Sequence, residues 1–181
     1  RWLWEMFGNE QALTAGFLFY YSDAPRDRRR GLTRESNDGT KLFEMDRNTH
    51  YWSLFAEHLF KWGRLSLVPG FRLEMISMAV KEKFNTGVTR PLIKEDFFSA
   101  VPLFGLGMGF DLGKENEFYA NLSQGYRPKA YDDLANPTSN AQRAPKDFEE
   151  SRTWNYEAGF RGQPAPWFLY DTSVFFTDYD T

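Results

Sequence analysis

The sequence predicts an all-β fold: a fragment of an antiparallel transmembrane β-barrel with about eight up-and-down strands. Three observations support this prediction. Apolar and polar residues alternate along most of the chain, short and long connections alternate between the expected strands, and many aromatic residues occur beside many charged ones. The 181 residues include 18 Phe, 9 Tyr and 6 Trp, and 26% of the residues are charged. The mean hydropathy is nevertheless only -0.60.

The composition excludes several classes of protein. A disordered chain would contain far fewer aromatic residues. A helical membrane protein would contain apolar runs of about 18 residues or more, and the sequence has none. Without cysteine, the chain has no disulfide scaffold, thiolate metal site or cysteine nucleophile. A net charge of -3 gives no reason to expect binding to nucleic acid.

Alternation is the clearest pattern in the chain. Successive side chains of a strand point to opposite faces, so alternation marks a strand with one apolar and one polar face. In residues 153–162 the even positions are apolar, including Trp154, Tyr156 and Phe160, and the odd positions are polar or glycine. The clearest segments are 64–75, 98–112, 117–126 and 153–162. Weaker alternation occurs at 11–22, 50–60 and 167–179. Residues 1–7 are expected to form the last part of a further strand.

The connections between these segments alternate strictly in length. Short segments rich in Gly, Asn and Pro lie at 8–10, 61–63, 113–116 and 163–166. Long polar connections are expected at 23–48, 80–96 and 127–152. In a meander of strands, this order places every short turn at one end of the sheet and every long loop at the other.

This asymmetry favours a membrane barrel over a soluble β-sandwich. Loops of roughly 17 to 26 residues at one end only are uncommon in compact domains, whereas transmembrane barrels combine short turns with long external loops. The apolar face would then contact lipid and the polar face the lumen. We therefore expect the side chains of Phe104, Leu106, Tyr156 and Phe160 to face lipid rather than a second sheet. The alternative remains a soluble all-β ligand- or carbohydrate-binding module that uses surface Trp and Tyr.

Five stretches, in order, resemble the barrel of TonB-dependent outer-membrane receptors (siderophore receptors). They are YWSLFAE at 51–57, RLSLVPGFRLE at 64–74, FYANLSQGYRP at 118–128, WNYEAGFRG at 154–162 and LYDTSVFFTDY at 169–179. The similarity covers most of the chain from about residue 10. Within the family, the chain looks closest to the ferric dicitrate receptor branch.

The resemblance implies a 22-stranded barrel in the outer membrane of a Gram-negative bacterium, closed by an N-terminal plug domain. Such receptors take up a ferric siderophore, and the TonB complex energises its release inward. Iron would enter only as part of the transported chelate, and no bound cofactor is expected. Residues 1–181 would form part of one barrel domain, with the plug domain and the barrel C-terminus absent. Further expected partners are outer-membrane lipid and lipopolysaccharide.

The expected loop at 23–48 contains a cluster of arginines. Guanidinium groups hold carboxylates through paired hydrogen bonds, so such a cluster suits an anionic chelate of the ferric citrate type. The competing interpretations of the cluster are a solvated charged loop and contact with lipopolysaccharide phosphates. Two further basic residues follow the segment 117–126 and either join the cluster or belong to the lumen. The candidates are Arg26, Arg28, Arg29, Arg30, Arg34, Arg127 and Lys129.

Four charged residues are expected on the lumen face of the strands: Arg72, Glu74, Glu157 and Arg161. Charges there would satisfy one another through cross-strand ion pairs, which is the interpretation we favour, or would contact the plug.

No pattern indicates an enzyme or a metal site. We find no Ser/His/Asp constellation, and His50 and His58 have no neighbouring ligand cluster. Gly105, Gly107 and Gly109 lie on one strand face but lack the spacing of a nucleotide-binding loop. They are expected to allow another element, here the plug, to approach closely.

Overall fold

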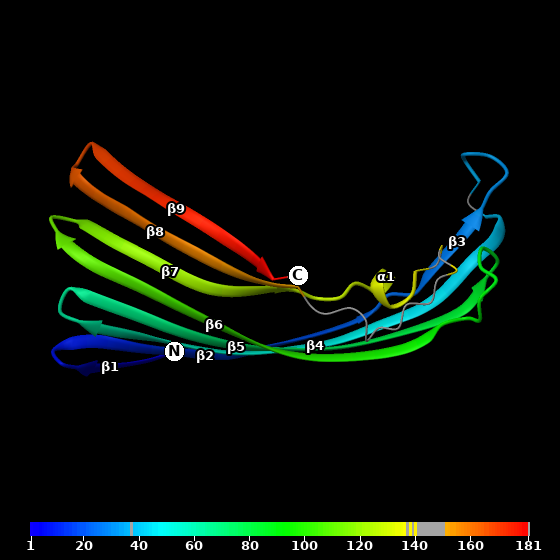
Figure 1. The fold of residues 1–181 in the computed structure, drawn as a ribbon, viewed down its shortest axis with the longest axis horizontal. Helices are drawn as coiled ribbons and strands as arrows, with labels where there is room; N and C mark the ends of the chain where they lie inside the picture. Colours follow the sequence, from blue (N-terminus) through cyan, green and yellow to red (C-terminus); the bar gives the residue numbers. More distant parts are fainter. Residues whose placement is uncertain (37, 137, 139, 141–150, 181) are drawn as a thin grey trace.

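The computed structural model describes residues 1–36, 38–136, 138, 140 and 151–180 as one curved antiparallel sheet (Figure 1). Its strands are β1 (Trp2–Met6), β2 (Asn9–Asp23), β3 (Arg26–Arg30), β4 (Thr40–Trp62), β5 (Leu65–Asn85), β6 (Lys94–Gly113), β7 (Asn116–Arg127), β8 (Ser151–Ala165) and β9 (Phe168–Asp180). One helical turn, α1 (Tyr131–Leu134), interrupts the series. No helix within the described ranges is long and apolar enough to cross a membrane.

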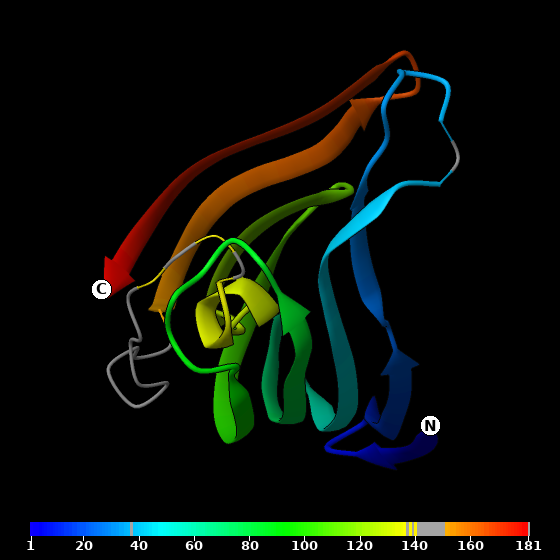
Figure 2. The same ribbon diagram turned by 90° about the vertical axis from the view of Figure 1, so that its right-hand side faces the viewer.

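The strands follow one another as neighbours in the sheet. The order is β1-β2-β4-β5-β6-β7-β8-β9, and β3 pairs with β4. Since β3 pairs with β4 just beyond the last β2 contact, β2 and β3 act as one long arm that is interrupted at residues 24–25. The eight expected strands correspond to β1, β2 and β4–β9, so the up-and-down all-β prediction is confirmed. The sheet is open, with β1 and β9 at its edges (Figures 1 and 2).

All short turns lie at one end of the sheet, which we call the turn end (Figure 1). Residues 7–8, 63–64, 114–115 and 166–167 form these turns. Phe7, Gly8, Lys114 and Glu115 have φ between 53° and 68°. Two successive residues with positive φ form the turn whose twist matches that of paired strands. The expected asymmetry of the connections is therefore confirmed.

The expected bounds of two long loops were wrong. Most of 23–48 is strand, because β3 and the first part of β4 lie within it, and β5 and β6 occupy much of 80–96. The charged residues that suggested a loop face away from α1 and pair across the strands. Lys83 Nζ lies 2.7 Å from Asp46 Oδ2 and 4.0 Å from Glu44 Oε1. This contact with Asp46 raises the pKa of Lys83. The described connections at this loop end are 31–36, 38–39, 86–93 and 128–130 with α1; residues 141–150 lie outside the described part.

The two faces of the sheet differ as the alternation predicts. On the convex face, the four residues expected to face lipid are exposed: Phe104 54%, Leu106 45%, Tyr156 43% and Phe160 47%. This apolar band runs along residues 52–62 of β4. These residues extend for about 33 Å along the strand and about 23 Å across a bilayer at 45° tilt. The band thus has about the height of the lipid-facing zone of a membrane barrel, and β3, β4 and β5 project beyond it.

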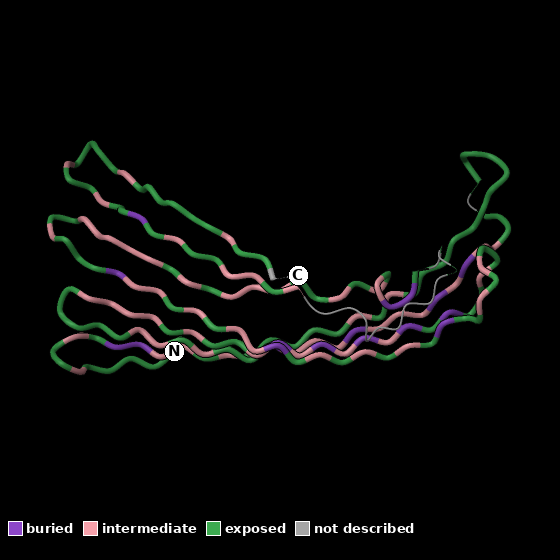
Figure 3. The backbone as a smooth tube through the Cα atoms, viewed as in Figure 1, coloured by how far each residue is buried: buried purple, intermediate pink, exposed green. Residues whose placement is uncertain are grey.

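Most of the buried residues lie toward the loop end of the sheet (Figure 3). There α1 and the segment after it pack over β4 and β5. The cluster consists of Phe43, Met45, Ile76, Met78, Val80, Ile93, Leu134 and Ala135. This small core holds α1 in the position that matters for the site described below.

Where two neighbouring strands separate, the side-chain amide of a glutamine takes the place of a backbone hydrogen bond between them. The amide of Gln11 donates to Lys61 O at 2.9 Å and accepts from Lys61 N at 3.1 Å. Gln11 is only 1% exposed. Likewise, Phe104 N donates to Gln124 Oε1 at 3.0 Å, just beyond the last β6–β7 pair. The side-chain amides thus satisfy backbone groups that apolar surroundings would otherwise leave unpaired.

Candidate functional site on the concave face

Three of the five clustered arginines form a row on β3. Because alternate residues of a strand share a face, Arg26, Arg28 and Arg30 point to the concave side. They line one cavity of about 440 Å³ together with the buried Phe43 and with Thr86. Among the described residues, Arg28 and Arg30 have no carboxylate within ion-pair distance. Within the described part of the chain, Arg28 and Arg30 therefore present positive charge to the concave face that no carboxylate pairs with.

The neighbouring α1 touches one end of this row. Arg26 Nη1 lies 3.2 Å from Asp132 Oδ1. The helical turn is held from below by Tyr131, whose hydroxyl lies 2.5 Å from Thr49 Oγ1. Arg47 stacks its guanidinium over the Tyr131 ring at 4.8 Å. The polar contacts and the small core therefore fix α1 against the sheet.

A buried ion pair fastens the connection 86–93 and the segment after α1. The side chains of Glu82 and Arg90 are 0% and 5% exposed, and their closest contact is 2.6 Å. The Glu82 carboxylate also accepts from Ile93 N at 2.9 Å, and Arg90 Nη2 donates to Asn136 O at 3.2 Å. Burial raises the pKa of Glu82, but the hydrogen bonds from Arg90, Ile93 N and Asn85 outweigh it and lower the pKa. We call the connection 86–93 and residues 131–136, which comprise α1 and the two residues after it, the loop cap.

Further toward the turn end, Arg72 and Glu74 form one network on the concave face. They pair with each other on the same strand rather than with Glu157 or Arg161. Arg72 Nε donates to Ser53 Oγ at 2.8 Å, and Tyr51 donates to the Glu74 carboxylate. Glu74 is 4% exposed, and these partners satisfy its buried charge.

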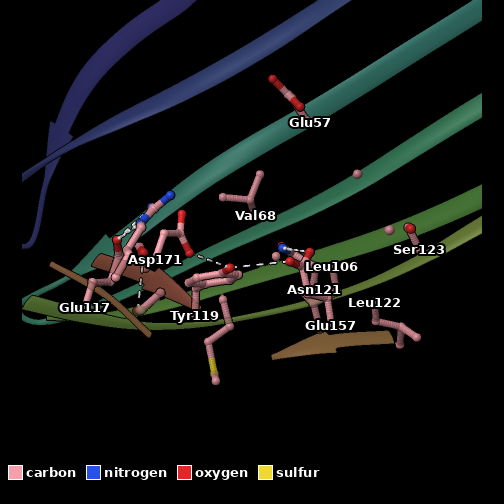
Figure 4. A pocket seen from close by; sticks show the side chains of 17 residues that line it. Glu57, Val68, Leu106, Glu117, Tyr119, Asn121, Leu122, Ser123, Glu157 and Asp171 are labelled. Carbon is pink, nitrogen blue, oxygen red and sulfur yellow. Dashed lines mark hydrogen bonds and ion pairs between the residues drawn. The ribbon is translucent and has the colours of Figure 1, made fainter. Parts of the chain in front are cut away.

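Glu157 and Arg161 belong to a second network, around Tyr119. Arg161 Nη2 lies 2.7 Å from Glu117 Oε2 across the β7–β8 pair, and its guanidinium stands 5.3 Å from the centre of the Tyr119 ring. The Tyr119 hydroxyl donates to Asp171 Oδ1 at 3.0 Å and lies 3.4 Å from Glu157 Oε1. Figure 4 shows Tyr119 between these two carboxylates. All four charged residues expected to face the lumen thus lie on the concave face, in two separate networks.

The second network borders a cavity of about 790 Å³. Gly70, Gly105, Gly107 and Gly109 line it. The backbone is open to approach at Gly70 and Gly105, whereas the side chains of Glu117 and Ser66 cover Gly109. At Gly105, an added Cβ would have 3.6 Å to its nearest neighbour, which is ordinary contact. Most of the charged residues in its walls are acidic: Glu57, Glu117, Glu157 and Asp171 stand beside the single basic Arg161.

The other four basic candidates are not among the described residues that line the cavity of the arginine row. Arg29 points to the opposite face, where its Nε donates to Asp27 Oδ2 at 3.0 Å. Arg34 lies in the connection 31–36, and Arg127 ends β7. Lys129 stands over the Phe97 ring, at 4.2 Å from its centre. Asp132, Glu82 and Arg90 were not singled out from the sequence, because no local pattern distinguishes them from solvated loop charges.

The charged side chains of the concave face are engaged largely in ion pairs with one another. Within the described ranges, no group of three or more His, Asp or Glu side chains is arranged to hold a metal ion. The row of guanidinium groups suits carboxylates or other oxyanions.

A comparison with known protein families identifies the chain. The family described as TonB dependent receptor-like, beta-barrel matches residues 1–181. The chain belongs to the TonB-dependent receptor β-barrel family. This is a family of receptors, not of enzymes, and its barrels lie in the outer membrane of Gram-negative bacteria. The convex band therefore faces lipid, and a soluble carbohydrate-binding module is not favoured.

Solved structures show the same fold. The ferric-catecholate import receptor Fiu from E. coli K12 aligns with a TM-score of 0.74 and 14% identity, covering 98% of this chain and 30% of Fiu. The ferric citrate transporter FecA gives 0.77 and 15%, covering 98% of this chain and 26% of FecA. The copper transporter OprC gives 0.69 and 19%, covering 97% and 28%. No curated protein sequence matches the chain. This TonB-dependent receptor barrel thus spans less than a third of the length of these three relatives, and identities below 20% show the fold alone.

Proposed function

We propose that the chain is part of an outer-membrane receptor that takes up an anionic iron chelate of the ferric citrate class, with release inward energised by the TonB complex. The observation that carries the proposal is the row Arg26, Arg28 and Arg30 on the concave face. In outer-membrane barrels the long loops are extracellular, so the row would meet a ligand that arrives from outside.

The spacing of the row suits a ligand with several carboxylates. Alternate residues of a strand are about 6.6 Å apart, so neighbouring guanidinium groups can each hold a different carboxylate of one chelate. Arginine offers two parallel N–H donors to each carboxylate. Iron is the cargo within the chelate, and the receptor needs no resident cofactor.

The similar structures differ in the ligand that their descriptions name, so they do not indicate which ligand this chain binds. They include proteins described as a ferric citrate transporter, a ferric-catecholate import receptor and a copper transporter. The arginine row is what favours an anionic chelate for this chain. Arg29 faces away from the row, so contact with lipopolysaccharide phosphates suits it better than the ligand does.

We further propose that the charged networks of the concave face are mainly structural. Arg72 is paired with Glu74, and Arg161 with Glu117, so each cation already has a carboxylate partner. The acidic walls of the glycine-lined cavity suit contact with a plug domain. Outer-membrane lipid would cover the convex band.

Titration of the full-length receptor with ferric citrate tests the proposal. The double variant Arg28→Ala/Arg30→Ala removes two charge-assisted contacts, each worth about 1.5–3 kcal/mol, and should weaken binding at least tenfold. Arg29→Ala is the matched control, because it removes the same charge from the opposite face, and it should bind as the wild type does.

The same titration with a neutral ferric siderophore and with cobalamin separates ligand classes. The proposal expects ferric citrate to bind most tightly and to depend most on Arg28 and Arg30. Equal affinity of the double variant and the wild type for ferric citrate would refute the role of the row.

A further inference from the structure

We propose that Asp132 sets the ligand affinity of the arginine row: its carboxylate pairs with Arg26, and an anionic ligand must displace it in order to use that guanidinium. The inference rests on the proposed function of the row. It adds a specific residue, on a different element, that opposes binding.

The pair joins two elements that are distant in sequence. Arg26 is the first residue of β3, and Asp132 belongs to α1; Arg26 Nη1 and Asp132 Oδ1 are 3.2 Å apart. The side chains of Arg26 and Asp132 are 43% and 59% exposed, so a ligand can reach them. An aspartate carboxylate has the same chemistry as each carboxylate of a citrate-type ligand, and both need the same guanidinium donors.

Asp132 is held at this place by the anchoring of α1 rather than by the ion pair. The hydroxyl groups of Tyr131 and Thr49 are hydrogen-bonded to each other, and Leu134 is 3% exposed in the small core. Arg90 donates a hydrogen bond to Asn136 O. The adjacent Asp133 has another task, because its carboxylate accepts from Ala130 N at 2.7 Å and caps the helical turn. Asp132 alone of the two therefore serves the arginine row.

The anchoring decides what displacement requires. Since α1 stays attached through its neighbours, a ligand has only to rotate the Asp132 side chain away from Arg26. The cost is then that of one exposed ion pair, together with the repulsion between the ligand and a nearby carboxylate. Exposed pairs change equilibria by about two- to fivefold.

The competition also favours highly charged ligands. A chelate with several carboxylates gains contacts at Arg28 and Arg30, where no carboxylate of the described residues competes, and this gain offsets the loss at Arg26. A ligand with one carboxylate lacks that compensation. Asp132 would thus sharpen the preference of the row for multiply charged chelates.

The test compares Asp132→Asn with Asp27→Asn in the full-length receptor, titrated with ferric citrate at low ionic strength. Asp27 lies next to Arg26 in the sequence but faces the opposite side, paired with Arg29. It therefore controls for the general loss of one negative charge. D132N should tighten binding about two- to fivefold, and D27N should change it by less than half of that factor.

The background variant Arg26→Ala shows whether the effect passes through the pair. With R26A, adding D132N should tighten binding of ferric citrate by less than half of its effect in the wild type, because only the repulsion between the ligand and Asp132 remains to be removed. An equal effect of D132N with and without Arg26 would show that the ion pair is not responsible. Hydrogen exchange of residues 131–136 should match the wild type in every variant, and Asp132→Ala should repeat the D132N result if the amide perturbs α1.

Two failures are distinguishable. If R28A/R30A weakens ferric citrate binding but D132N leaves it unchanged or weaker, the inference is wrong and the proposed function stands. If R28A/R30A binds as tightly as the wild type, the proposed function fails, and the inference fails with it.

Discussion

Replacing Arg90 by Met should detach the loop cap from the sheet. Glu82 as a whole residue is 4% exposed. Its carboxylate accepts two hydrogen bonds from the Arg90 guanidinium, at 2.6 Å and 3.0 Å. Removing one partner of a buried ion pair typically costs about 3–5 kcal/mol, because the remaining charge is left uncompensated. Met keeps most of the side-chain volume, so the change isolates the charge.

Hydrogen exchange of the full-length receptor in detergent measures the effect locally. A loss of about 3 kcal/mol corresponds to a hundredfold or greater rise in the exchange rates of residues 86–93 and 131–136. The matched control is Arg29→Met. It breaks an exposed pair, with side chains 48% and 55% exposed, and should cost less than about 1 kcal/mol. Equal exchange in R90M and R29M would refute the role of the buried pair.

Three further predictions concern the same sheet. The pKa of Glu82 is lowered in the folded protein, so the ionised carboxylate stabilises the loop cap fully above the unfolded pKa of about 4.3, and this stabilisation is lost as the pH falls through the lower folded pKa. Hydrogen exchange of the loop cap, corrected for the intrinsic pH dependence of exchange rates, should therefore rise only below about pH 4.3. A rise that begins near pH 6 would contradict this role of Glu82. Gly159→Ala places a Cβ 2.4 Å from Thr172 O and should cost about 1–3 kcal/mol in urea unfolding, whereas Gly105→Ala should leave the midpoint unchanged; equal midpoints would contradict the close approach. Gln11→Leu removes both hydrogen bonds to the Lys61 backbone and should lower the free energy of unfolding by about 1–3 kcal/mol. The loss should appear as a lower temperature of heat-induced unfolding, measured by gel mobility. An unchanged temperature would argue against the role of Gln11 as a bridge between the strands.

The strand pattern was predictable because it is local. Alternation at 98–112 and 153–162 identifies the apolar face residue by residue, and Phe104 and Tyr156 lie exposed on the convex face as expected. The turns were predictable for the same reason, since Gly8 and Gly63 take positive φ. These features depend on a few neighbouring residues and on the two-residue period of a strand.

The rest depends on contacts that are distant in sequence. Residues 40–48 read as a loop because Glu44 and Asp46 are charged, yet they pair across the strands with Lys83. Whether an arginine joins the row depends on the strand phase of β3, which a loop assignment cannot supply. Likewise, the partner of Arg161 is Glu117 rather than Glu157, because the register of β7 against β8 decides it.

We conclude that the chain forms part of the wall of a membrane barrel, with the even-numbered residues of β6 in lipid and the odd-numbered ones toward the lumen. Nitroxide labels placed singly at residues 101–108 of the full-length receptor in liposomes test it directly, through their accessibility to oxygen and to a polar relaxation reagent. Oxygen accessibility should peak at 102, 104, 106 and 108 and fall at the odd positions. Equal accessibility along the strand, or peaks at the odd positions, would contradict this orientation of β6.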